Sequence, residues 1–191
     1  MSRYDLLVFL HISAVIIWLG AGFLLALLVF GAARAGDRQK EAGYHQDVGW
    51  LAPRLFIPAS LSTFVLGLLL VIDGPWTFDQ LWITIGMAGW AASFGLGFFY
   101  FKPEGARIGA LVAERGPTDP EVDRRIHRLN LVDRLQLVIL FLVVANMVVK
   151  PTGSDDAGLL IAGAAILVAA TALAVKSLRA HGGSAKQSHA G

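Results

Sequence analysis

The feature that most constrains this chain is a series of apolar stretches, each long enough to cross a lipid bilayer. They cover residues 6–32, 55–72, 81–101, 135–149 and 157–175. A hydrocarbon core about 30 Å thick is crossed by roughly 20 apolar helical residues, and an open sheet cannot satisfy its backbone there. The sequence therefore predicts an all-α fold, a polytopic transmembrane helical bundle with about five spans.

The apolar stretches also suggest how the chain divides. Residues 1–151 are expected to form a four-span helical membrane core, and residues 152–179 a fifth, peripheral transmembrane helix that is rich in alanine and lacks aromatic side chains. Residues 180–191 have little to bury and are expected to form a disordered cytoplasmic tail.

The composition excludes several classes of function. Charged residues make up 16% of the chain, against about a quarter in an average soluble protein. With no cysteine, the chain has no disulfide, no thiolate nucleophile, no cysteine-ligated zinc and no iron–sulfur cluster held by its own thiolates. The basic residues flank the ends of the apolar stretches, so the expected partners are the lipid bilayer and its anionic lipids, not nucleic acid.

The distribution of lysine and arginine predicts the topology. These residues are abundant in 33–54 and in 102–134, absent from 73–80, and represented in 150–156 by Lys150 alone. Because cytoplasmic connections carry the excess of positive charge, we expect the N-terminus outside and the C-terminus in the cytoplasm. The expected location is a bacterial cytoplasmic (inner) membrane, crossed several times.

Proline and glycine mark the expected helix ends. Lys102-Pro103-Glu104-Gly105 and Lys150-Pro151-Thr152-Gly153 each combine a cation, a proline and a glycine, a pattern typical of a helix C-terminus. A short interfacial helix around Ile108 would come after the first of these stops. After a break at Gly116-Pro117, a helix capped by Asp119 would run into the fourth span.

Small residues predict where helices approach closely. Gly89, Ser93 and Gly97 recur at four-residue spacing in the third span, and Gly86 precedes them. In lipid, small residues let helix backbones pack together. The third span is therefore expected to be the central, closely packed helix.

His11 is the one ionisable residue well inside an apolar stretch, and it is the first candidate for a functional site. Three interpretations are open: a hydrogen bond between helices that only stabilises the bundle, a haem or metal ligand, or a contact for protons or a substrate. A neutral imidazole can bind a metal through one nitrogen while its other N–H bonds a neighbour.

Depth in the membrane limits the second ligand that a haem on His11 could have. By the predicted topology Met87, Met147 and Lys150 lie in the same half of the bilayer as His11 and are candidate second ligands of haem b. A bis-histidine site is not expected, because His45 and His127 belong to the opposite side. By default, however, Met87 and Met147 are ordinary core residues.

Charged residues at the other boundary suggest two further roles. Arg54 and Asp133 begin two spans at the same side, so we expect a structural ion pair between them, with proton transfer at Asp133 as the alternative. Arg124, Arg125 and Arg128 would form a collar that contacts lipid headgroups.

Two short regions carry a family resemblance. Leu10-His11-Ile12-Ser13-Ala14 with Trp18-Leu19-Gly20, and the later segment Asn146-Met147-Val148-Val149-Lys150-Pro151, resemble an uncharacterised bacterial family of predicted integral membrane proteins that has only a DUF label. That family is distantly similar to the CopD copper-resistance membrane domain and to HemJ, a haem-associated protoporphyrinogen oxidase. The similarity covers roughly residues 6–151.

The resemblance implies a compact helical bundle with His11 at the position of the shared histidine and Lys150 as a second polar element. The chain departs from that pattern in its fifth span. It also lacks the methionine-rich periplasmic segments expected of copper handling, with only three methionines in the chain, so copper import is not expected.

Three classes of function are compatible with these features. The first is a small scaffold or accessory subunit, in a homo-oligomer or a larger membrane complex. The alternative is a haem- or metal-binding redox protein centred on His11. A transporter of ions or small solutes is the third, less favoured because no pair of broken helices marks a pathway. No nucleotide loop or catalytic triad is present, so the sequence predicts no particular reaction.

Overall fold

The computed structural model describes residues 2–152 together with residues 163 and 169. In residues 2–152 the chain is helical apart from short turns. The predicted fifth span at 152–179 and the predicted tail at 180–191 lie, apart from residues 152, 163 and 169, outside the described residues. The all-α prediction is confirmed for the described part.

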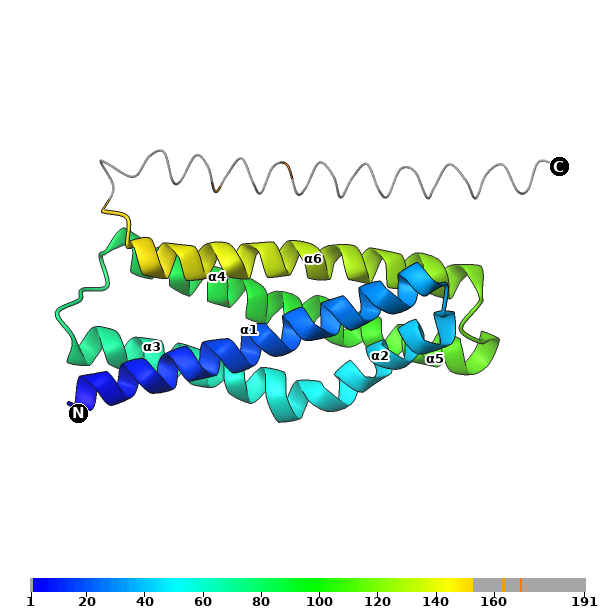
Figure 1. The fold of residues 1–191 in the computed structure, drawn as a ribbon, viewed down its shortest axis with the longest axis horizontal. Helices are drawn as coiled ribbons and strands as arrows, with labels where there is room; N and C mark the ends of the chain where they lie inside the picture. Colours follow the sequence, from blue (N-terminus) through cyan, green and yellow to red (C-terminus); the bar gives the residue numbers. More distant parts are fainter. Residues whose placement is uncertain (1, 153–162, 164–168, 170–191) are drawn as a thin grey trace.

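Four helical units in this part are long and apolar enough to cross a membrane: Arg3–Ala35, Arg38–Asp73, Leu81–Arg115 and Pro120–Val149. The first is helix α1 (Arg3–Ala35) and the last is helix α6 (Pro120–Val149). Figure 1 shows these two helices running along the long axis of the molecule. The prediction of a four-span helical core thus agrees with four membrane-length helices.

Each of the two middle units contains a π-turn. The second unit consists of α2 (Arg38–Leu51), η1 (Ala52–Phe56) and α3 (Ile57–Asp73). The third consists of α4 (Leu81–Leu96), η2 (Gly97–Phe101) and α5 (Lys102–Arg115). Both units are therefore continuous helices that run past the apolar stretches.

The prediction that a helix ends at residues 102–105 is wrong, because the helix continues through them. Proline lacks an N–H and clashes with the carbonyl four residues earlier, and the wider π-turn relieves that clash. Pro103 comes shortly after η2, and Pro53 lies in η1. For the same reason the separate interfacial helix predicted around Ile108 is instead the second half of the third unit.

The other predicted helix ends agree with the structure. The Asp119 side chain accepts hydrogen bonds from the backbone N–H groups of Glu121 and Val122, so it caps α6. At its other end α6 stops at Lys150, which adopts a left-handed conformation with φ 51°. Helix α3 ends at Asp73, directly before Gly74 and one residue after the predicted apolar stretch 55–72.

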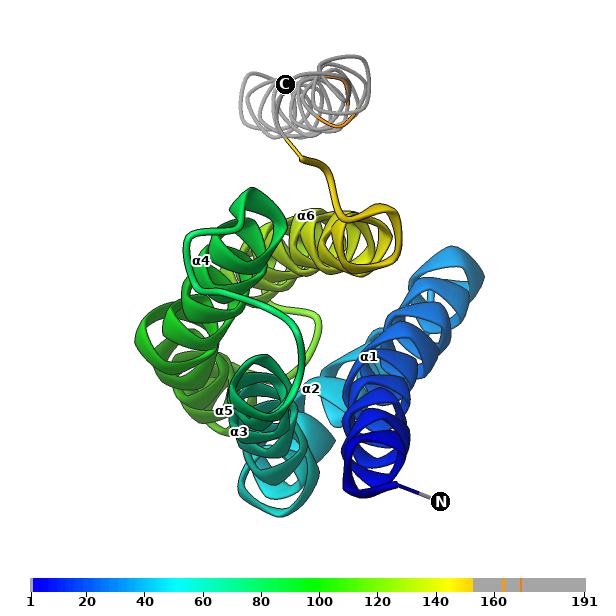
Figure 2. The ribbon, with the colours of Figure 1, turned by 90° about the vertical axis from the view of Figure 1, so that its left-hand side faces the viewer.

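The helices pack mainly as two pairs, α1 with α3 and α4 with α6, as the end-on view in Figure 2 shows. In the second pair, Gly86 and Gly89 of α4 lie against Met147 and Val143 of α6. The prediction that α4 packs closely through small residues is confirmed at these two glycines. It fails at Gly97, which begins η2 and has no neighbour where a Cβ would stand.

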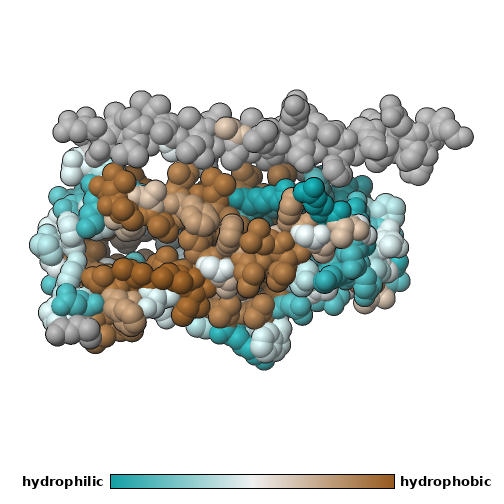
Figure 3. Space-filling model, viewed as in Figure 1, coloured by the Kyte–Doolittle hydropathy of each residue, from teal (hydrophilic) through white to brown (hydrophobic). Residues whose placement is uncertain are grey.

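At one end of the bundle, α2, α5 and the first half of α6 (residues 120–134) form a polar region that we call the cap. Its core consists of Ala42, Ile108, Val122, Ile126 and Leu129. Figure 3 shows hydrophilic side chains over this end, a broad hydrophobic surface over the middle of the described helices, and further hydrophilic side chains at the opposite end. The helices therefore extend beyond the apolar zone and pack there around a core of their own.

Candidate functional site

His11 lies on α1 against α3. Its Nδ1 atom is 2.9 Å from the backbone carbonyl oxygen of Thr63, and the side chain is half-buried. A carbonyl oxygen can only accept, so Nδ1 carries the hydrogen that it donates. In the neutral imidazole, Nε2 then holds the free lone pair.

Gly67 of α3 has no side chain and therefore leaves room for the imidazole of His11. A Cβ added at Gly67 would stand 3.2 Å from His11 Cε1 and 3.6 Å from Nδ1. Gly67 comes one helical turn after Thr63, so the carbonyl and the gap face the same way. A larger residue at Gly67 would push the ring away from the Thr63 carbonyl.

A second polar contact lies next to this one along α3. Trp90 Nε1 of α4 donates to both the carbonyl oxygen and Oγ of Ser60, each at 3.0 Å. The Trp90 ring stacks between Phe64, at 4.0 Å between centroids, and Phe94, at 5.1 Å. We did not predict these contacts, although Ser60, Thr63 and Gly67 recur at helical spacing within an apolar stretch.

Helix α6 presents a seam of side chains to the rest of the bundle, spaced alternately by three and four residues. The seam consists of Val122, Ile126, Leu129, Asp133, Gln136, Leu140, Val143 and Met147. Gln136 Nε2 donates to Ser93 Oγ of α4 at 2.9 Å, and Gln136 Oε1 is buried with no hydrogen-bond partner among the described residues. The seam is thus apolar except at Asp133 and Gln136.

The predicted second ligands make contacts of their own at the end of the bundle opposite the cap. Met147 packs against Gly86 and joins the cluster of Val71, Trp82 and Ile83. Met87 is exposed on α4. None of these contacts involves His11.

Lys150 is held by aromatic rings. Its Nζ lies 4.3 Å from the centroid of Trp76 and 5.6 Å from that of Trp82. Trp76 Nε1 donates to the hydroxyl of Tyr4 at 2.9 Å, which ties the turn after α3 to the start of α1. The amine of Lys150 thus stabilises the junction of three chain segments by cation–π contacts.

The structure does not bring Arg54 and Asp133 together. Arg54 Nη1 donates to the carbonyl oxygen of Trp50 at 3.0 Å, and its guanidinium lies 4.7 Å from the Trp50 ring centroid. The ion pairs of residues 2–152 do not include one between Arg54 and Asp133.

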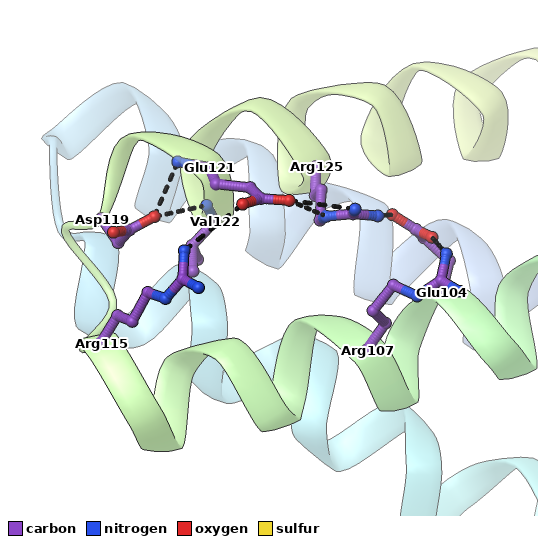
Figure 4. A network of polar contacts seen from close by, with 7 residues as sticks. All are labelled: Glu104, Arg107, Arg115, Asp119, Glu121, Val122 and Arg125. Atoms are coloured by element: carbon purple, nitrogen blue, oxygen red, sulfur yellow. Dashed lines mark hydrogen bonds and ion pairs between the residues drawn. The ribbon is translucent and has the colours of Figure 1, made fainter.

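The predicted arginine collar separates into two kinds of residue. Arg125 belongs to an internal network, with Nη1 2.7 Å from Glu104 and Nη2 3.0 Å from Glu121, as Figure 4 shows. Arg124 and Arg128 are exposed, line a recess beside that network, and form no ion pair within the described residues. Of the three arginines of the predicted collar, these two are thus outside the network.

The cap also holds a buried charge that we did not predict. The side chain of Glu41 is 2% exposed and accepts hydrogen bonds from Asn130 Nδ2 and Arg38 Nη1, both at 2.9 Å. Arg38 also pairs with Asp123 at 2.9 Å. His45 Nε2 is buried with no hydrogen-bond partner in this part of the chain. The polar pattern of α2 contained no signal for this buried cluster.

Within residues 2–152, 163 and 169, no group of three or more His, Cys, Asp or Glu side chains could hold a metal ion.

Comparison with known proteins gives one match. The family model described as a predicted integral membrane protein (DUF2269) matches residues 5–151. No match was found among curated proteins or solved structures.

Proposed function

Because that match spans most of the chain, the protein belongs to the DUF2269 family of predicted integral membrane proteins. We propose that it binds haem or a metal ion through His11. The orientation of the imidazole carries this proposal, since the Thr63 carbonyl takes the Nδ1 hydrogen and leaves the Nε2 lone pair free. A ligating histidine almost always donates its other N–H to such a partner.

The group we propose is b-type haem, held by His11. When bound, haem supplies one-electron transfer, which would make the protein a redox protein. Thr63 fixes the tautomer, and Gly67 keeps the ring in place. Met147 and Lys150 are engaged in other contacts, so His11 is the residue that would hold the haem. Met87, Met147 and Lys150 are the proposed candidates for a second ligand.

The test is the absorption spectrum and metal content of the full-length protein, purified from membranes of a haem-replete host. We expect a Soret band that His11→Gln removes without lowering the folded yield. Gly67→Ala should reduce haem occupancy because the added methyl group displaces the imidazole. Ser62→Ala, an exposed neighbour on α3, is the matched control and should leave the spectrum unchanged. Wild-type protein with neither a Soret band nor stoichiometric metal would contradict the proposal.

A role as a scaffold or accessory subunit is the second candidate, supported by the outer face of α1. Phe9, Ile12 and Ile16 are exposed there, and the buried residues of this helix are Ala14, Val29 and Ala32. Such a face meets either lipid or another membrane helix. Cross-linking in native membranes and light scattering of the detergent-solubilised protein should then reveal a homo-oligomer or a larger complex in both wild type and His11→Gln. A monomer in both would exclude this role.

We further propose that the cap faces the cytoplasm and that the turn at residues 74–80 lies outside. The cap contains most of the lysine and arginine of the described chain, which supports this orientation. Arg124 and Arg128 would then contact anionic lipid headgroups. Reporter fusions after Gly36 and Gly116 should indicate cytoplasm, and a fusion at Gly74 the outside. An external signal at Gly116 would contradict the proposed orientation.

A further inference from the structure

Two polar residues interrupt the apolar seam of α6 at the border between the cap and the spans. Asp133 lies four positions after the cap residue Leu129, and Gln136 precedes buried Leu140 by four. Residues three or four apart on a helix lie on the same face. Asp133 and Gln136 therefore point with the seam toward the neighbouring helices and are neighbours of each other.

The amide of Gln136 is only half satisfied. Its Nε2 donates to Ser93 Oγ at 2.9 Å, whereas Oε1 is buried with no hydrogen-bond donor among the described residues. A buried acceptor left without a partner costs about 1–3 kcal/mol. This atom therefore requires a donor.

Asp133 is a carboxyl group without a partner. It is half-buried and makes neither a hydrogen bond nor an ion pair within residues 2–152. The charged group that acts on it is Arg134, the next residue, whose guanidinium lies 5.6 Å from the Phe30 ring of α1. On α4, the polar residue that contacts the seam here is the uncharged Ser93. Arg54 does not pair with Asp133, because it donates to the carbonyl oxygen of Trp50. A lone carboxylate beside hydrocarbon is costly.

We propose that Asp133 is a proton-binding site of the bundle. Its carboxylate takes one proton from water on the cap side, and the resulting O–H donates to Gln136 Oε1 while Gln136 Nε2 stays on Ser93 Oγ. One protonation thus removes the unpaired charge and supplies the missing donor. The ionised form satisfies neither group.

This site gives the bundle interior a group that exchanges protons at the border of the cap. It involves no residue of the His11 contact, so it stands or falls independently of haem binding. Its position on α6 places it where water that reaches the cap meets the spans.

Infrared spectroscopy of the full-length protein in lipid tests the proposal directly. In mildly acidic buffer the wild type should show the carbonyl stretch of a protonated carboxyl group, and Asp133→Asn should abolish that band. Asp123→Asn is the matched control on the same helix, where the carboxylate is paired with Arg38 at 2.9 Å, and it should leave the band intact. Gln136→Leu should move the band to higher frequency because the hydrogen bond is lost.

Two results would overturn the proposal. If Asp133 is ionised, the Gln136 amide turns so that Nε2 donates to the carboxylate and Oε1 accepts from Ser93, and the wild type then lacks the band. If Asp133→Asn does not fold, Gln136→Leu decides the question in the presence of Asp133. A band in the same position in Gln136→Leu and in the wild type would show that the two groups do not share a hydrogen bond.

Discussion

The cap and the spans are parts of the same helices, yet different contacts hold them together. In the cap, large apolar side chains are fully buried: Ile108 is 1% exposed and Val122 0%. In the spans, the closest contacts involve small residues such as Gly86 and single polar pairs such as Trp90 with Ser60. Water drives apolar burial in the cap, whereas lipid tails are as apolar as leucine and drive none.

Helix α6 makes this contrast within one element. Its first half buries Val122, Ile126 and Leu129 in the cap core. Its second half is joined to α4 by polar bonds, from Gln136 to Ser93 at 2.9 Å and from Asn146 Nδ2 to the carbonyl oxygen of Trp82 at 2.7 Å. Along this one helix, apolar side chains thus contribute most of the stability in the cap, whereas polar pairs contribute it in the spans.

The largest effect is expected from a truncation in the cap core. Ile108→Ala should lower the free energy of unfolding by about 2–5 kcal/mol, because it leaves a cavity among fully buried side chains. Ile16→Ala on α1, where the side chain is 64% exposed, should change it by less than about 0.5 kcal/mol. Denaturant unfolding of both variants in the same detergent measures the difference. Equal losses would show that the cap core is no more important than the outer face of α1.

The buried charge in the cap gives the next effect. Asn130→Leu removes one of the two donors to Glu41 and should cost about 1–3 kcal/mol, since a buried acceptor loses a partner. The double variant Glu41→Leu/Asn130→Leu should be more stable than addition of the two single losses predicts, because it leaves no unpaired carboxylate. Strictly additive losses in the same unfolding assay would argue against a coupled pair.

Much of the fold could be predicted, because membrane-length apolar stretches and the Asp119 cap are local signals. The continuation of the helix through Pro103 could not, since proline usually stops a helix and only the preceding π-turn accommodates it. The cap was missed for a related reason. The polar residues of α2 were interpreted as a connection, although Ala42 and Glu41 face a buried interface.

The candidate site was predictable at His11 but not at its partners. A lone histidine in an apolar stretch is visible in any sequence, whereas its partner here is the backbone carbonyl of Thr63, a group that every residue has. Arg54 and Asp133 were paired because they share a depth. Direction around the helix also matters, and η1 contains Arg54, where one extra residue in the turn rotates the rest of the helix by about 100°.

The smallest effect, and the most direct test of how the spans are held, concerns Trp90 and Ser60. Trp90→Phe keeps an aromatic ring between Phe64 and Phe94 but removes the donor to Ser60. A double-mutant cycle with Ser60→Ala isolates the side-chain part of that contact, and polar contacts between membrane helices average about 0.6 kcal/mol with a maximum near 1.7.

We expect a coupling energy within that range, measured by unfolding in detergent or bicelles. Trp50→Phe, at a tryptophan that is 60% exposed, is the control and should show no coupling to Ser60. A coupling energy above about 3 kcal/mol would mean that the span contact behaves like the buried interactions of the cap, because large losses come from fully buried groups. A value near zero would mean that the Ser60 hydroxyl contributes nothing, and that the bond to the Ser60 backbone carbonyl and the ring stack join α3 to α4 at this depth.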